Sequence, residues 1–250
     1  MSNFLKTGRK IVAIGRNYAD HAKELGNAIP KEPFFFLKPT SSYLSPGQGP
    51  VELPRGTIVH HEVELGVVIG KNGRDIPLEK AESYIAGYTL AIDMTARNVQ
   101  DAVKAKGLPW STAKGFDTFT PIGKFIPKDL VGNSANVGLH FSIDGKLKQS
   151  GLTSDMIFDI PQLIAFVSGI MRLEASGGIA CPISGLQRKA DGIHQEGDVV
   201  LTGTPKGVGP IKHGETFQAS LTYPGVEGEK LDEIEFECRD REGGYEFQGK

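Results

Sequence analysis

The sequence predicts a mixed α/β fold that is rich in strands. It holds 32 glycines and 15 prolines in 250 residues, which favours many turns and short strands over a helical bundle. Most of its apolar runs are short and are bounded by turn residues. Its hydrophobic content of 39% is typical of a globular protein, and this length suits one domain with an ample core.

The predicted elements follow from these local patterns. Apolar or alternating runs predict strands at 10–15, 33–39, 60–70, 88–93, 137–143, 146–149, 198–201, 217–221 and 234–238. Apolar faces with suitable capping residues predict helices at 17–26, 78–84, 95–107 and 157–173. Thr95 suits the N-cap of the third helix, and Pro161 falls in the first turn of the fourth. We expect the three phenylalanines of 33–39 to pack in the core.

Two acids on one strand are the first candidate site. Glu62 and Glu64 share a parity, so a strand places both carboxylates on one face, about 7 Å apart. The strand then becomes continuously apolar, so its acidic end lies near the interior. Buried carboxylates repel each other and lose hydration, and a divalent cation relieves both costs. The alternative is a solvated strand edge with harmless acids.

Asp93 is a third acid at the end of a predicted strand, just before a predicted helix. It can serve in helix capping, or as a third oxygen ligand of a hard cation. Arg97 and Gln100 lie in or near the first turn of that helix. Three carboxylates suit Mg²⁺ or Mn²⁺ better than zinc.

His21 and Glu24 are three residues apart on the first predicted helix, so they are neighbours on one face. A carboxylate beside an imidazole orients it and raises its basicity, as a general base requires. The alternative is a surface ion pair. Short helices of this kind depend on docking.

Several classes of function are disfavoured. A net charge of −2 gives no electrostatic reason to expect a nucleic acid or an anionic membrane as partner, and no apolar run reaches the roughly 18 residues of a membrane span. Cys181 and Cys238 match no ligand pattern and indicate a reducing compartment or at most one bridge. The glycine-rich segment 202–210 lacks the order of a P-loop. The first ten residues are basic and faintly resemble a transit peptide, so we expect a mitochondrial or cytoplasmic protein.

Five motifs in order resemble the fumarylacetoacetate hydrolase family, most closely its single-domain acylpyruvate hydrolases and oxaloacetate decarboxylases. They are Gly15-Arg16-Asn17-Tyr18, His60-His61-Glu62-Val63-Glu64, Asp93-Met94-Thr95-Ala96-Arg97, Lys114-Gly115-Phe116-Asp117 and Thr202-Gly203-Thr204-Pro205. The likeness covers about 10–174 and 196–238. It implies a β-sandwich roll with peripheral helices, one catalytic domain over 1–250 with a polar tail at 239–250, and a homodimer. Residues 175–195 depart from the pattern as an inserted loop, either a lineage-specific feature or retained non-coding sequence.

The resemblance also implies the site residues and their roles. Mg²⁺ would bind Glu62, Glu64 and Asp93 and chelate the α-keto acid end of a small keto-acid substrate. His21 and Glu24 would activate water from a lid helix, with Lys114 as the third catalytic residue. The substrate would be bound by the remaining matched residues, Arg16, Arg97, Gln100 and Thr204.

Three reactions fit such a site: acylpyruvate hydrolysis, oxaloacetate decarboxylation through a metal-bound pyruvate enolate, and enol–keto tautomerisation of oxaloacetate. The sequence does not rank them, because each needs the same enolate-stabilising centre. A hydratase or isomerase on dienoic acids is a further possibility within the family, and the complete pair of His21 and Glu24 favours the hydrolase–decarboxylase branch. From another class, a non-catalytic metal- or ligand-binding module is disfavoured by the presence of both the acids and that pair.

Overall fold

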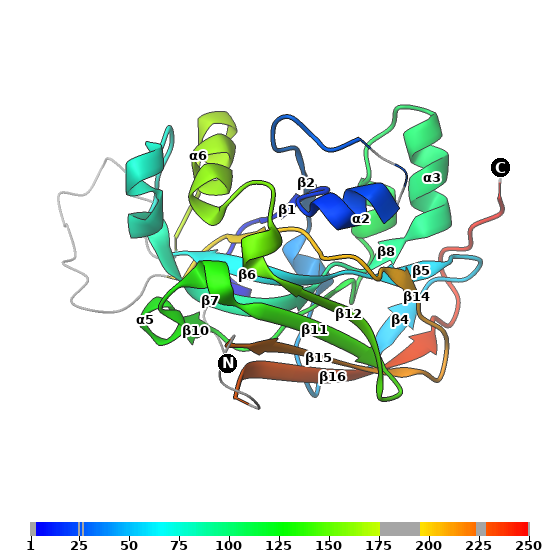
Figure 1. Ribbon diagram of the computed structural model, residues 1–250. Coiled ribbons are helices and arrows are strands. Elements are labelled where there is room, and N and C mark those ends of the chain that lie inside the picture. Colours follow the sequence, from blue (N-terminus) through cyan, green and yellow to red (C-terminus); the bar gives the residue numbers. More distant parts are fainter. Residues whose placement is uncertain (1–3, 25, 27, 176–195, 224–228, 250) are drawn as a thin grey trace, which may run out of the picture.

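A computed structural model describes residues 4–24, 26, 28–175, 196–223 and 229–249 (Figure 1). Its largest sheet has six strands in the order β10-β7-β6-β13-β1-β2. The two long strands β6 and β7 pair in antiparallel fashion, with Val63 opposite Ile92 and Leu65 opposite Leu90. β1 is parallel to β13, and the other neighbours are antiparallel. The strands are β1 (Ile11–Ile14), β2 (Phe35–Lys38), β6 (Val63–Ile69), β7 (Ile85–Ile92), β10 (Ile126–Pro127) and β13 (Val199–Leu201).

A second sheet of five strands has the order β12-β11-β15-β16-β4. Its hairpin β11–β12 turns at Asp144 and Gly145, both with positive φ, as the Asp-Gly pair predicts. One core cluster joins the two sheets, including Val63 and Leu65 of β6 and Phe141 and Phe217 of the second sheet. The strands are β4 (Val51–Leu53), β11 (Gly138–Ile143), β12 (Lys146–Leu152), β15 (Thr216–Thr222) and β16 (Lys230–Asp240).

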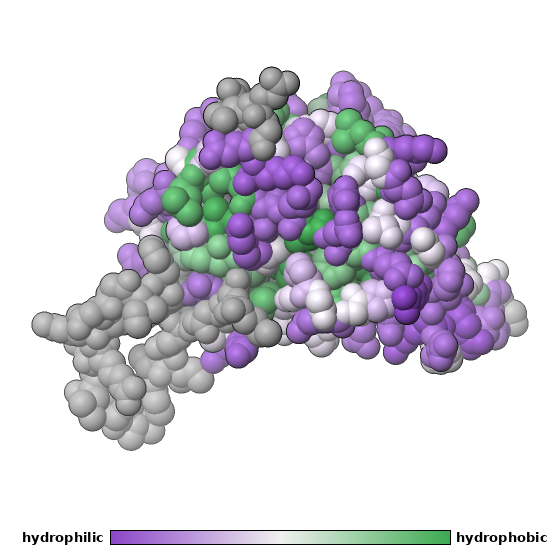
Figure 2. All heavy atoms as spheres, turned by 90° about the horizontal axis from the view of Figure 1, so that it is seen from below, coloured by the Kyte–Doolittle hydropathy of each residue, from purple (hydrophilic) through white to green (hydrophobic). Residues whose placement is uncertain are grey.

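The outer face of the second sheet is polar. Along β16 every second residue from Asp232 to Cys238 is buried, and the intervening acids Glu233, Glu235 and Glu237 are exposed. Viewed from below, the molecule shows mainly hydrophilic side chains with smaller hydrophobic areas between them (Figure 2). The five-stranded sheet therefore has one face in the core and one in solvent.

Short strands and helices complete the fold, with α2, α3 and α6 above the six-stranded sheet in the view of Figure 1. Small sheets are formed by β14 (Gly209–Pro210), β5 (Val59–His61) and β8 (Thr95–Ala96), and by β3 (Tyr43–Leu44) and β9 (Thr120–Pro121). The α-helices are α1 (Phe4–Thr7), α2 (Ala19–Glu24), α3 (Arg97–Ala105), α4 (Ser111–Lys114), α5 (Lys128–Val131) and α6 (Ile160–Ile170). The 3₁₀ helices are η1 (Thr40–Ser42), η2 (Leu78–Tyr84), η3 (Ser134–Asn136) and η4 (Thr153–Asp155). No helix within the described residues is long and apolar enough to cross a membrane.

The predicted strand-rich mixed α/β class is confirmed, and so are most elements. The side chain of Asp159 accepts the Gln162 N–H and so caps α6, and a proline lies in the first turn of this helix as predicted. Residues 176–195, which include Cys181 and nearly all of the predicted insertion, lie outside the described residues. The domain boundaries stay a prediction.

Two local predictions differ from the structure. Thr95 does not cap α3, because it pairs with His60 in β8 and the helix begins two residues later, with Ala96 at the N-cap. The short helix predicted at 78–84 is confirmed and is of the 3₁₀ type. The three phenylalanines of 33–39 are only half-buried, whereas Lys38 at the end of their strand is 1% exposed.

Candidate active site

The pairing of β6 with β7 brings the three predicted acids together. Glu62 lies between β5 and β6, and Asp93 directly follows β7. The backbone N–H of Asp93 donates to Glu62 O at 2.8 Å. Glu64 is the second residue of β6. Candidate ligand oxygens of the three carboxylates all lie within 4.8 Å of one another, and all three residues are buried. We call Glu62, Glu64 and Asp93 the carboxylate cluster.

Three cationic side chains contact the carboxylate cluster. Lys114 Nζ lies 2.8 Å from Glu62 Oε2 and 2.6 Å from Asp93 Oδ2. Arg97 Nη2 lies 2.5 Å from Glu62 Oε1. Lys38 Nζ lies 2.5 Å from Asp93 Oδ1 and donates to Phe119 O at 2.8 Å. Glu62 and Asp93 are therefore each held by two cations.

These contacts shift the pKa values in opposite directions. Burial alone would raise the pKa of Glu62, but Lys114 and Arg97 outweigh it and lower that pKa. Burial also opposes the charge of Lys114, but the carboxylates of Asp93 and Glu62 raise its pKa. For Lys38 burial prevails over Asp93, and its pKa is lowered. Glu62 and Lys114 thus each favour the charged form in a water-poor site.

Glu64 differs from the other two acids. Its carboxylate accepts the Gly203 N–H at 2.7 Å, and no cationic side chain of the described chain pairs with it. Burial, Asp93 and Glu62 together raise its pKa well above the ordinary value. A buried carboxylate without a counter-charge, facing two others, fits a hard divalent cation with oxygen ligands.

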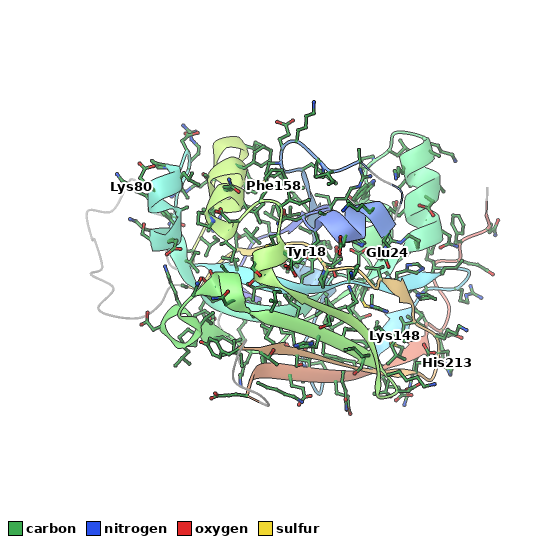
Figure 3. The ribbon with its side chains drawn as sticks, in the orientation of Figure 1. Tyr18, Glu24, Lys80, Lys148, Phe158 and His213 are labelled. Carbon is green, nitrogen blue, oxygen red and sulfur yellow. The ribbon has the colours of Figure 1, made fainter. Side chains whose placement is uncertain are left out.

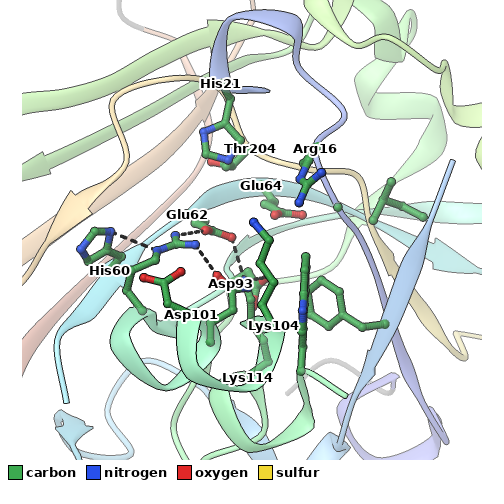
Figure 4. A pocket seen from close by; sticks show the side chains of 16 residues that line it. Arg16, His21, His60, Glu62, Glu64, Asp93, Asp101, Lys104, Lys114 and Thr204 are labelled. Atoms are coloured by element: carbon green, nitrogen blue, oxygen red, sulfur yellow. Dashed lines mark hydrogen bonds and ion pairs between the residues drawn. The ribbon is translucent and has the colours of Figure 1, made fainter. Parts of the chain in front are cut away.

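His21 and Glu24 come from α2 above the carboxylate cluster. The buried His21 places Nδ1 3.4 Å from Glu24 Oε2. Both carboxylate oxygens of Glu24 also accept the Gly207 N–H at 3.1 Å, which ties α2 to the loop after β13. Figure 3 shows Glu24 on α2, and Figure 4 shows the His21 ring directed into the pocket. The imidazole is thus held with one nitrogen toward its carboxylate and the other available to the cavity.

Thr204 is fixed by a buried amide. Gln149 is fully buried; its Oε1 accepts from Val63 N–H at 3.1 Å and contacts His61 Nδ1 at 2.8 Å. Its Nε2 donates to Thr204 Oγ1 and to Pro205 O, both at 2.8 Å. The Thr204 hydroxyl donates in turn to Val63 O at 2.8 Å. Every polar atom of the Gln149 amide is therefore used to position this wall of the site.

A cavity of about 320 Å³ opens above the carboxylate cluster (Figure 4). It brings together every site residue predicted from the sequence except Glu24, which acts from behind His21. Its wall also contains residues that the sequence did not single out as site residues: Phe36, His60, Asp101, Lys104 and Trp110. The pKa of His60 is lowered to about 4 by burial and by the neighbouring Arg97, so this ring is a neutral part of the wall.

This fold and site define a strand-rich enzyme-like domain whose cavity ends on buried carboxylates. The chain belongs to the fumarylacetoacetate hydrolase family, because residues 10–235 match the family model described as fumarylacetoacetate (FAA) hydrolase C-terminal. The predicted resemblance is thereby confirmed. Its carboxylate cluster is a group that could hold a metal ion.

Two curated relatives are similar over most of their length. One is "Oxaloacetate decarboxylase, mitochondrial" of Dictyostelium discoideum, 55% identical over 89% of this chain and 93% of the relative. The other is "Oxaloacetate tautomerase FAHD1, mitochondrial" of Arabidopsis thaliana, 48% identical over 96% of each chain. Among solved structures, fumarylpyruvate hydrolase from Pseudomonas aeruginosa in complex with Mn²⁺ and pyruvate has a TM-score of 0.75 and 30% identity, covering 94% of this chain and 91% of that one.

Proposed function

We propose that this protein is a Mg²⁺- or Mn²⁺-dependent enzyme acting on small β-keto acids that carry an α-keto acid end. The proposed reactions are oxaloacetate decarboxylation and acylpyruvate hydrolysis, both through a pyruvate enolate. The observation that carries the proposal is the buried carboxylate cluster at the base of a cation-lined cavity. The names of the curated relatives support oxaloacetate as substrate, and the Mn²⁺ and pyruvate of the solved neighbour support the ion and the product class.

Glu62, Glu64 and Asp93 would hold the ion, which when bound chelates the keto acid and supplies Lewis-acid stabilisation for its developing negative charge. Arg97 and Lys114 already lie beside the carboxylate cluster, and we assign them to the same developing charge. Gln100 accepts from Arg97 Nη1 at 2.5 Å and keeps the guanidinium in place. We assign Arg16, Arg97, Gln100 and Thr204 to substrate binding.

In hydrolysis, His21 takes a proton from a water molecule that attacks the distal carbonyl of the acylpyruvate. The C–C bond then breaks, its electron pair forms the pyruvate enolate, and protonation of the enolate carbon gives pyruvate beside the released carboxylic acid. Glu24 orients His21 and stabilises its charged form. In decarboxylation the electron pair left by departing CO₂ forms the same enolate, so no water attack is needed.

Enol–keto tautomerisation of oxaloacetate is the second candidate, favoured by the name of the Arabidopsis relative. It requires only that a proton moves between the enol oxygen and the neighbouring carbon, and the imidazole of His21 is available to the cavity for that transfer. The same enolate charge is stabilised, so the carboxylate cluster serves all three reactions.

The test is turnover of oxaloacetate and of acetylpyruvate by purified protein, with Mg²⁺ and with EDTA. Pyruvate release and the ultraviolet change of the enol are followed separately. Ion-dependent pyruvate release supports cleavage, and the ratio of the two rates identifies the main reaction. Tautomerisation without pyruvate release would assign the protein to the isomerases, and no turnover of either keto acid would reject the proposal.

We also infer a homodimer, as the family resemblance implies, and a mitochondrial location, as the names of the relatives suggest. Light scattering on the purified protein tests the first inference, and a fluorescent fusion of the full chain tests the second. A monomer at micromolar concentration, or a diffuse cytoplasmic signal, would contradict them.

A further inference from the structure

The cavity wall contains two cationic side chains besides Lys114 and Arg97. Arg16 reaches the pocket from the corner between β1 and α2, and Lys104 from α3 on the opposite side (Figure 4). The cations nearer the base are engaged with protein carboxylates, since Lys114 and Arg97 contact Glu62. Arg16 has no carboxylate partner among the described residues, and its guanidinium lies 5.4 Å from the centre of the Phe34 ring.

The fold presents Arg16 in a fixed geometry. Its backbone is left-handed, with φ 55°, a conformation that non-glycine residues seldom adopt. The next residue, Asn17, is fully buried, and its side chain bonds Phe158 and Thr202 at 2.8 to 3.0 Å. A Cβ at Gly15 would lie 2.3 Å from the Phe34 ring, so glycine there allows the ring to pack against this corner. The corner is therefore held by tertiary contacts that persist without a ligand.

The balance of charge points to the ligand. The cavity wall holds as many cationic side chains as carboxylates before an ion is bound: the cations are Arg16, Arg97, Lys104 and Lys114, and the acids are Glu62, Glu64, Asp93 and Asp101. A divalent ion at the carboxylate cluster adds further positive charge, so a dianionic substrate complements the site better than a monoanion. A guanidinium with a fixed fork is the side chain best suited to a carboxylate.

We propose that Arg16, assisted by Lys104, binds the carboxylate of the substrate that is remote from its α-keto acid end. The protein then selects α-keto dicarboxylates such as oxaloacetate over acylpyruvates, whose distal group is uncharged. This inference rests on the proposed function, because it takes the α-keto acid end to lie at the carboxylate cluster. It assigns Arg16 to the distal carboxylate of the substrate and adds Lys104 of α3 to the substrate-binding residues.

The test compares oxaloacetate with acetylpyruvate in the full-length protein with Mg²⁺. For Arg16→Gln we expect KM for oxaloacetate to rise about tenfold more than KM for acetylpyruvate, as loss of one charge-assisted pair predicts. Arg16→Lys should recover part of that difference, since the charge is kept and the fork is lost. For Lys104→Gln we expect KM for oxaloacetate to rise about threefold more than KM for acetylpyruvate. Lys106→Gln is the matched control, because Lys106 is an exposed lysine at the end of the same helix outside the pocket.

Equilibrium binding provides a readout without turnover. Calorimetry with Mg²⁺ should show that Arg16→Gln lowers the affinity for oxaloacetate about tenfold more than the affinity for pyruvate, which lacks the distal carboxylate. Equal weakening of both ligands would place Arg16 at the α-keto acid end and overturn the proposal. Failure of the wild-type protein to turn over either keto acid would reject the proposed function instead, and the calorimetric comparison would still decide the role of Arg16.

Discussion

The two ends of the cavity are built from different kinds of structure. The base is set by the long pair β6–β7, whose buried register fixes Glu62, Glu64 and Asp93 beside one another. The mouth is set by α2 of only six residues and by the corner at Arg16, held through side-chain contacts with the 202–210 loop and the segment before α6. Under the proposed function, the base provides the chemistry common to all candidate reactions, whereas the mouth decides which substrate and which proton transfer follow.

Removing one acid from the base should have the largest effect. Glu64→Gln keeps the shape but takes away the carboxylate that has no protein counter-charge, so we expect every activity to fall on the order of 10³-fold or more. Calorimetric titration with Mn²⁺ should show the accompanying loss of ion binding. Glu79→Gln, an exposed acid in η2, is the control. Retained turnover in Glu64→Gln would show that the cluster is not the chemical centre.

A change at the mouth should separate the reactions. His21→Ala removes the proposed proton acceptor, and we expect the rate of acetylpyruvate hydrolysis to fall about 10²- to 10⁴-fold. Oxaloacetate decarboxylation should fall less than about tenfold, because no water proton has to be removed in it. His213→Ala is the control, because this exposed histidine pairs with Asp240 at the end of β16 (Figure 3). Equal losses of rate in the two reactions would contradict the proposal that the mouth of the cavity, rather than its base, distinguishes the reactions.

The wall between the two ends depends on Gln149. Gln149→Leu leaves the Val63 N–H without its acceptor and Thr204 Oγ1 without its donor. We expect the free energy of unfolding to fall by about 1 to 3 kcal/mol and kcat/KM to fall about tenfold. Urea unfolding and steady-state rates measure the two effects. Gln48→Leu, in an exposed loop, is the control. A purely structural role would lower stability and leave the kinetics of the folded enzyme unchanged.

The smallest effect should come from the surface contact that ties α2 to the 202–210 loop. Lys206 Nζ lies 3.0 Å from Asp20 Oδ2, and both side chains are largely exposed. Lys206→Gln should therefore change kcat for hydrolysis by less than about threefold, and any change should shrink in 0.5 M salt, where such pairs are screened. A tenfold change would mean that this pair, rather than Glu24 with Gly207, holds α2.

The sequence predicted the base of the cavity better than its surroundings, for a physical reason. Glu62 and Glu64 share a face because strand geometry is periodic, and Asp93 follows an apolar strand, so local patterns made them candidates and the family resemblance joined them into one set. Lys38 gave no local signal, and it is buried because Asp93 and Phe119 lie against it from distant parts of the chain. Gln149 and Lys104 gave no local signal either, since a glutamine on a hairpin and a lysine on an amphipathic helix are ordinary surface residues until the fold is known.

The same distinction explains the errors in secondary structure. Thr95 has the chemistry of an N-cap, yet pairing with His60 places it in a strand. The phenylalanines of β2 were expected in the core, but that strand is an edge of the six-stranded sheet, so Phe35 and Phe36 pack against the core from half-buried positions and Phe36 also lines the cavity. Tertiary pairing, which a single sequence does not reveal, decided each of these cases.

The most direct test is a titration of metal-stripped protein with Mn²⁺, in which bound ion and oxaloacetate turnover are measured on the same samples. We predict that turnover, read as enol loss and as pyruvate release, is absent in EDTA and rises in proportion to bound ion until one ion is held per chain. Glu64→Gln should bind no ion and show no turnover over the same range. Full activity of the stripped protein, or ion binding that leaves the rate unchanged, would contradict a reaction centred on Glu62, Glu64 and Asp93.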